Sequence, residues 1–172
     1  DSDTNTDTKI YSCLVTANIS APYATGGICG RCCNATNIGT NLDVSTGNVV
    51  KDCIVWSAAM TSNKKTAPSA GYSSGAIVGF TGLQNTMENC VRRPDMVFDM
   101  FPAAEYNVLT DNENASSASP LTRAFTDATA DKFYAPYNGK AAAVGETPSA
   151  VAIRLGWSAD KWDLSKDGPV LK

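Results

Sequence analysis

The sequence predicts an all-β-dominated fold, a right-handed parallel β-helix (solenoid) with a small helical, tryptophan-containing C-terminal cap. Three observations lead to this prediction. A short motif centred on a cysteine recurs along the chain, a motif bounded by glycines alternates with it, and Gly, Asn, Asp and Ser residues separate the copies. Short strands joined by such turns and repeated along a chain are typical of solenoids, in which each repeat stacks on its neighbour.

The cysteine motif occurs three times, as IYSCLV at 10–15, VKDCIV at 50–55 and MENCVR at 87–92. Each copy has an aliphatic residue or Met three positions before the cysteine, a polar residue directly before it and an aliphatic residue directly after it. Alternation of apolar and polar residues is the period of a half-buried strand. We therefore expect equivalent strands at these three places, 40 and 37 residues apart.

The glycine motif occurs as GGICG at 26–30 and GAIVG at 75–79, 49 residues apart. A short apolar run between glycines predicts a strand whose ends need tight corners or positive φ. The uneven spacing of the motifs indicates constant strands with loops of variable length between them. The longest of these expected insertions are residues 34–48 and 66–74.

These segments resemble the GLUG-type repeat, whose pattern is Gly-Gly, an aliphatic residue, Val-Gly, a short turn and a strand ending in an Asn-Cys-type pair. The resemblance covers residues 9–93, but Cys29 replaces the usual aliphatic residue and the third cysteine motif has no glycine motif after it. The tail from residue 135 resembles the terminal segment that follows such repeats, with Leu-Gly-Trp and then Trp-Asp-Leu-Ser. The resemblance implies an adhesin-like cell-surface protein of Bacteroidetes, here the C-terminal end of a β-helix array.

The sequence divides into three expected parts. Residues 1–8 are polar and without period, which predicts a disordered lead or linker, and a preceding part of the same longer chain is the expected neighbour. Residues 9–97 are the degenerate β-helix repeats. Residues 98–172 are an irregular stretch and the C-terminal capping segment.

The capping segment contains the elements with the clearest signals. Thr147 as N-cap, Pro148 at the first helical position and Gly156 as stop predict a short helix, and a second helix is expected over residues 121–134. Residues 169–171 predict a final edge strand. We expect this helix, Trp157 and Trp162 to lie across the open end of the solenoid, because that end exposes strand edges and core.

Composition excludes several functional classes. The 172 residues carry a net charge of −3 and only 18% charged side chains, which favours an extracellular or outer cell-surface protein. The longest basic runs are Lys64-Lys65 and Arg92-Arg93, so no basic stripe for nucleic acid is expected. No apolar stretch approaches the roughly 18 residues of a membrane span. The absence of His excludes His-based triads and most zinc sites.

The six cysteines have three explanations. An exported chain could form disulfides. Cys29, Cys32 and Cys33 could bind a metal, although C-x-x-C-C without His is poor ligand spacing. The favoured interpretation places the cysteines of the three cysteine motifs at equivalent positions, stacked as small buried hydrophobic side chains. We therefore predict no metal and no cofactor.

Acidic residues are the only candidate catalysts, because glycoside hydrolysis needs two carboxyl groups at a set separation. The candidates are Asp52, Glu88, Asp95 and Asp99. Lys51 aligns with Glu88, and Asp52 with Asn89, so these positions are expected to be the solvated face of repeated strands. No phosphate-binding or dinucleotide-binding motif is present. The sequence therefore predicts no catalytic residue.

The function expected from the sequence is a non-enzymatic surface module that displays a rigid β-helix for adhesion or ligand binding. Its expected partner is a glycan or a host or cell-surface protein, bound by a flat face or by inserted loops. Trp56 and Tyr72 are candidates for stacking on sugars. The alternative is a glycan-processing enzyme or a carbohydrate-binding accessory module, since a solenoid can carry either function.

Overall fold

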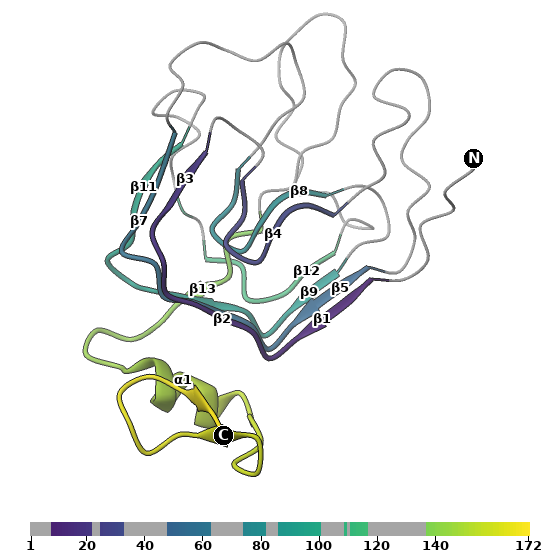
Figure 1. The fold of residues 1–172 in the computed structure, drawn as a ribbon. Coiled ribbons are helices and arrows are strands. Elements are labelled where there is room, and N and C mark those ends of the chain that lie inside the picture. The colour runs from purple at the N-terminus through teal and green to yellow at the C-terminus, as the bar shows by residue number, and fades with distance from the viewer. Residues whose placement is uncertain are drawn as a thin grey trace, which may run out of the picture.

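The structure is a computed structural model that describes residues 8–21, 25–32, 48–62, 74–81, 86–100, 109, 111–116 and 137–172. Within these ranges the fold consists of short strands in mostly parallel sheets and one short helix near the C-terminus (Figure 1). The chain makes three similar passes through the parallel sheets. The strands of the first pass are β1 (Lys9–Tyr11), β2 (Leu14–Val15), β3 (Ile19–Ala21) and β4 (Cys29–Cys32). Those of the second are β5 (Val49–Lys51), β6 (Ile54–Val55), β7 (Ala59–Ser62) and β8 (Val78–Thr81). Those of the third are β9 (Thr86–Glu88), β10 (Val91–Arg92) and β11 (Val97–Asp99).

Strands at the same place in successive passes pair in parallel. One sheet contains β1, β5 and β9, a second β2, β6 and β10, a third β3, β7 and β11, and β4 pairs with β8. The register is constant, so that Ile10, Val50 and Met87 of the three cysteine motifs are aligned. Figure 1 shows the strands of each sheet one behind another, with bends where one sheet meets the next. The strands predicted at the cysteine motifs are therefore confirmed.

The bend between the first two sheets has the same backbone conformation in each pass. Ser12, Asp52 and Asn89, directly before the cysteines, have φ of 51°, 53° and 50°. Short polar side chains tolerate this left-handed region better than most residues. The side chain of Asn89 also donates to the Asp52 carboxylate of the pass before it, with Nδ2 and Oδ1 3.1 Å apart. The repeated polar residue before each cysteine thus fixes a repeated corner.

The glycine motifs form a second constant feature, but their strands begin later than the sequence predicts. Gly26 bridges to Gly75 in parallel, and Ile28 and Ile77 lie in the turns that precede β4 and β8. The reason is close backbone approach: a Cβ on Gly26 would lie 2.1 Å from the Cys29 carbonyl oxygen, and one on Gly75 would lie 2.2 Å from that of Val78. These glycines serve backbone packing.

The main core lies between the three parallel sheets and the β4–β8 pair. Its buried side chains come mostly from the second and third passes and include Val50, Cys53, Val55, Met60, Ile77, Met87 and Cys90. Hydrophobic residues of the first pass, among them Ile10, Cys13 and Ile19, pack on this cluster but are only partly buried. The core is therefore closed around the middle of the stack and thins toward the first pass.

Residues 111–116 and 137–142 continue two of the sheets beyond the third pass. β12 (Ala115–Ser116) pairs with β9 in the antiparallel direction, and β13 (Lys140–Ala141) pairs with β10 in parallel. Tyr137 is 1% exposed and belongs to the main core. The side-chain oxygen Oδ1 of Asn138 accepts a 3.0 Å hydrogen bond from the Ala76 amide, in place of a backbone carbonyl oxygen.

The predicted C-terminal helix is confirmed as α1 (Pro148–Arg154), with the Thr147 side chain accepting from the Ala150 amide at the N-cap. Gly156 follows with φ of 75°. A hairpin of β14 (Trp162–Asp163) and β15 (Val170–Leu171) comes next, so the final edge strand is confirmed as well. We call residues 142–172 the C-terminal unit.

The position expected for this unit is wrong. Val151, Ala152 and Trp157 form a second core cluster with Leu14, Ile54 and Val91, which project from the face of the β2–β6–β10 sheet opposite the main core. The Trp157 indole N–H donates to the Asp52 carbonyl oxygen at 2.8 Å, in the middle pass. The helix and tryptophans therefore cover a side of the stack, while its end is closed by the residues described above.

Some of the elements and residues predicted from the sequence fall outside the described residues. The helix over 121–134, Cys33, Tyr72 and residues 1–7 lie outside the ranges that the structure describes. The domain limits at residues 8 and 97 stay predictions. In the described part of the chain no helix has the length and apolar character needed to cross a membrane.

Candidate functional site

The most regular exposed surface is the outer face of the β1–β5–β9 sheet, which we call the lateral face. Alternation along each strand places Ile10, Val50 and Met87 toward the core and their neighbours outward. The outward residues that directly precede the corner are aligned by the register and form one row. This row consists of Tyr11, Lys51 and Glu88.

The charges in the row neutralise each other, while its aromatic end stays exposed. The Lys51 ammonium lies 2.9 Å from the Glu88 carboxylate, and the hydrogen bond to Glu88 raises the pKa of Lys51. Tyr11 is 50% exposed at the first-pass end of the row. A flat, nearly neutral strip with one exposed aromatic ring can bind a ligand by stacking and hydrogen bonds, without attracting ions strongly.

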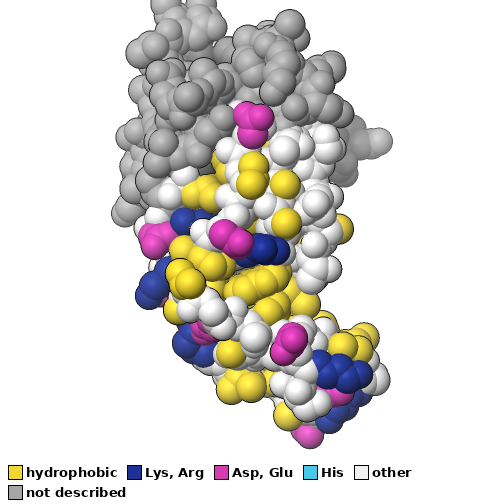
Figure 2. Space-filling view, turned by 90° about the vertical axis from the view of Figure 1, so that its left-hand side faces the viewer, with side chains coloured by type: hydrophobic (Ala, Val, Ile, Leu, Met, Phe, Trp, Pro, Cys, Tyr) yellow, Lys and Arg dark blue, Asp and Glu magenta, His cyan; other side chains and the backbone are white. Residues whose placement is uncertain are grey.

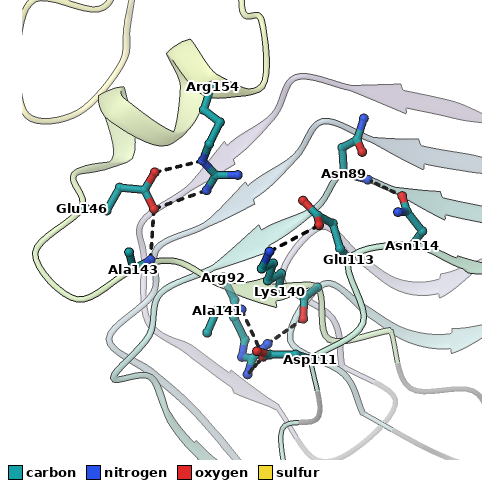
Figure 3. A network of polar contacts seen from close by, with 11 residues as sticks. Asn89, Arg92, Asp111, Glu113, Asn114, Lys140, Ala141, Ala143, Glu146 and Arg154 are labelled. Carbon is teal, nitrogen blue, oxygen red and sulfur yellow. Dashed lines mark hydrogen bonds and ion pairs between the residues drawn. The ribbon is translucent and has the colours of Figure 1, made fainter.

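A polar network joins the third pass to the closing segments (Figure 3). Its centre is Arg92, which occupies the interior position that Val55 fills in the second pass. One guanidinium nitrogen donates to the Gly139 carbonyl oxygen at 2.6 Å and another to the Asp111 carboxylate at 2.7 Å. Burial alone would raise the pKa of Asp111, but hydrogen bonds from Arg92 and the Ala141 amide hold that pKa below its usual value.

The outer part of this network continues the lateral face. Asn114 accepts a 3.0 Å hydrogen bond from the Asn89 amide through Oδ1, and Lys140 lies 3.7 Å from Glu113 (Figure 3). The network thus carries the polar surface past the third pass, with side chains that replace the missing strand partners. The polar side chains of this network already make hydrogen bonds and ion pairs within the fold.

The structure places the four candidate acids at four separate places in the second and third passes. Asp52 lies at a corner, where Asn89 donates to it, and Glu88 lies on β9. Asp95 follows β10 and pairs with Arg93, whose hydrogen bonds lower the pKa of Asp95, and Asp99 lies on β11. Asp52 has an amide partner, and Glu88 and Asp95 each pair with a cation. On the side formed by β3, β7 and β11, Figure 2 shows acidic and basic side chains scattered among hydrophobic ones.

Cys13, Cys53 and Cys90 occupy equivalent positions, as predicted. Each thiol lies 3.2 to 3.4 Å from the carbonyl oxygen two residues before it, and none of the three is in a disulfide. A hydrogen bond with Cys90 and burial raise the pKa of Cys53, and burial raises the pKa of Cys13. Protonated, buried thiols are weak nucleophiles and weak metal ligands. The part of the chain that the structure describes contains no group of three or more potential metal-binding residues.

The aromatic candidates divide between packing and exposure. Trp56 is half-buried against the second core cluster, and Trp157 and Trp162 stack within the C-terminal unit with ring centroids 4.8 Å apart. Trp56 is therefore a packing residue more than an open stacking platform. Tyr11 and Arg92 were not among the residues predicted from the sequence to have a functional role. The signal for Arg92 was available, because MENCVR has Arg where IYSCLV and VKDCIV have Val.

Comparison with known proteins gives no relative. No family model matches the chain, and neither a curated protein nor a solved structure matches it.

Proposed function

We propose that the three passes are turns of a right-handed parallel β-helix. Its support is the constant register, the repeated positive φ before each cysteine and the chain order of the parallel strands. Right-handed connections are the rule between parallel strands, because strand twist favours them. The resemblance of residues 9–93 to GLUG-type repeats favours the same arrangement.

On this scaffold the chain acts as a non-enzymatic, adhesin-like module at the cell surface or outside the cell. The observation that carries this proposal is the exposed row of Tyr11, Lys51 and Glu88 on a regular sheet. Its two charges are paired with each other, and its aromatic ring is open to a partner. Such a surface fits a glycan or a cell-surface protein that binds by stacking and hydrogen bonds.

The alternative is a carbohydrate-binding accessory module or a glycan-processing enzyme. Tyr11 supports the first of these two, because an exposed ring is the usual platform for a sugar face. The described carboxylates support hydrolysis less, since Glu88 and Asp95 each pair with a cation and the lowered pKa of Asp95 does not suit a general acid near neutral pH.

The test is binding of the whole chain to a printed array of bacterial and mammalian glycans. We expect Tyr11→Ala to weaken any binding about two- to tenfold, because an aromatic contact contributes about 0.5–1.5 kcal/mol. The matched control is Val97→Ala, which truncates a side chain 59% exposed on β11 and should leave binding unchanged. The absence of binding to any glycan would contradict the glycan-binding form of the proposal, and equal loss in both variants would contradict the lateral face as its site.

A further inference from the structure

The four sheets of the stack end on one side in strands of the first pass. β1, β2, β3 and β4 are the terminal strands of their sheets, and among the described residues each pairs only with its second-pass equivalent. In Figure 1 these four strands are the purple ones nearest the viewer. A terminal strand has N–H and C=O groups that point away from the sheet and can pair with another strand.

The hydrogen bonds of the later passes identify those groups. The amides of Val49, Ile54 and Trp56 donate to first-pass carbonyl oxygens at 2.7 to 2.8 Å. The third pass repeats this pattern onto the second at 2.8 to 2.9 Å, through Thr86, Val91 and Arg93. The equivalent first-pass residues are Lys9, Leu14 and Thr16. Their amides point away from the second pass, and no described residue accepts from them.

Burial shows the same asymmetry in the interior. Cys53 and Met60 of the second pass are 0% exposed. Their first-pass equivalents, Cys13 and Ile19, face the same core but are only half-buried. The first pass therefore exposes an apolar cross-section of the core beside a row of backbone donors that no described residue uses.

At the opposite end of the stack, a following segment of the chain pairs with the third pass. Lys140 and Ala142 donate to Cys90 and Arg92, which continues the same ladder by one partial strand. The antiparallel β12 and the buried guanidinium of Arg92 then interrupt the pattern. A second copy of the chain therefore cannot offer its third pass to the first pass of its neighbour.

We propose that the first-pass edge is a strand-addition site for an extended polypeptide segment that carries the cysteine motif and pairs with β1 and β2 in parallel. The proposal rests on the stacked arrangement of the proposed function. The bound segment would continue the β1–β5 and β5–β9 interfaces, so it must have the same sequence pattern as those strands. This pattern is an aliphatic residue, a spacer residue, a Ser, Asp or Asn at positive φ, a cysteine and an aliphatic pair. Its carbonyl oxygens accept from the unused amides, and its apolar side chains cover Cys13.

The experiment adds a synthetic peptide of residues 48–56 to the whole chain and follows alkylation of Cys13 by iodoacetamide with mass spectrometry. The Cys53 position of the peptide is changed to Ala, so that the probe does not consume reagent. At a peptide concentration ten times its Kd, about one tenth of the sites stay free, so Cys13 should react about tenfold more slowly. Cys90, which is 0% exposed, is the internal reference for global unfolding. A control peptide with Asp at the Val50 and Val55 positions should give no protection.

Variants of the chain test the backbone part of the site. Lys9→Pro removes one unused donor at an edge, where proline is tolerated, whereas Lys9→Ala retains it. We expect peptide protection of Cys13 to be lost in the first variant and kept in the second, with thermal unfolding midpoints close to that of the parent chain. Thr16→Pro and Thr16→Ala provide the same comparison beyond β2, should Lys9→Pro fail to fold.

Several results would overturn the proposal. Unchanged alkylation with saturating peptide, or equal protection by the control peptide, would show that the edge takes no such segment. A Cys13–Cys13 cross-link between two chains, with no peptide effect, would identify a second copy as the occupant. Binding of glycans through Tyr11 is measured separately, so failure here leaves the proposed function standing.

Discussion

The two ends of the stack contain the same motif in different surroundings. At the third-pass end, Arg92, Asn138 and two short strands satisfy the backbone and cover the core. At the first-pass end, no described residue accepts from the outward-pointing amides of Lys9 and Leu14, and the thiol of Cys13 is half-buried. Similar sequence motifs therefore give unequal burial, because burial in a stack depends on the neighbouring pass more than on the motif itself.

The closed end shows that ending a stack requires residues that the repeat does not contain. A buried arginine replaces valine, a side-chain amide replaces a carbonyl, and an antiparallel strand replaces a parallel one. Arg92 bonds the Gly139 carbonyl of the closing segment, Asn138 accepts from Ala76 of the second pass, and the antiparallel strand pairs with β9. Together these changes interrupt the regular edge on which a further pass could pair. Two predictions test the contrast between the two ends.

Arg92→Ala should cause the largest loss, because it removes the bonds to Gly139 and Asp111 and leaves a cavity in the closed end. We expect the free energy of unfolding in urea to fall by about 3 kcal/mol or more. Val15→Ala, at the aligned first-pass position, should cost about 1 kcal/mol, because this side chain is only partly buried. Equal losses in the two variants would contradict the difference between the ends.

Met60→Ala and Ile19→Ala compare aligned residues of the second and first passes. Met60 is 0% exposed, so its truncation should cost about 2–5 kcal/mol in chemical unfolding. Ile19 is half-buried at the open end, and its truncation should cost roughly half as much. An Ile19→Ala loss as large as that of Met60→Ala would mean that the first-pass edge is covered in solution.

The strands and the C-terminal helix could be predicted because their signals are local. The period-2 pattern of VKDCIV and the Thr147-Pro148 start need no knowledge of the rest of the chain. The position of α1 could not be predicted in this way. Leu14, Ile54 and Val91 form an apolar row on the outer face of the sheet only when the passes are in register. The helix α1 packs on that row and not at the end of the stack. Arg92 was predictable from the motif alignment, whereas its partner Asp111 was not.

The smallest expected effect on stability concerns the C-terminal unit, which belongs to neither end of the stack. The hydrogen bond from Arg154 lowers the pKa of Glu146 from its ordinary value of 4.5. Stability from this pair is fully present above pH 4.5 and is lost as pH falls through the lowered pKa of the folded chain. We expect Glu146→Gln to reduce the free energy of unfolding at pH 7 by less than about 1 kcal/mol, because Arg154 is partly exposed. The two proteins should converge in stability once the pH falls below the lowered pKa of Glu146, and a difference that persists at the acid limit of an unfolding series would assign the loss to packing.

The hydrogen bond from the Trp157 indole to the Asp52 carbonyl joins residues 105 positions apart. Its acceptor is a corner that exists only when the second pass has formed its positive-φ turn. We therefore expect docking of the C-terminal unit to follow assembly of the middle of the stack, because contacts of such long range are slow to form. Trp157 also lies against Trp162, so the fluorescence of this pair provides an intrinsic signal for the last step of folding.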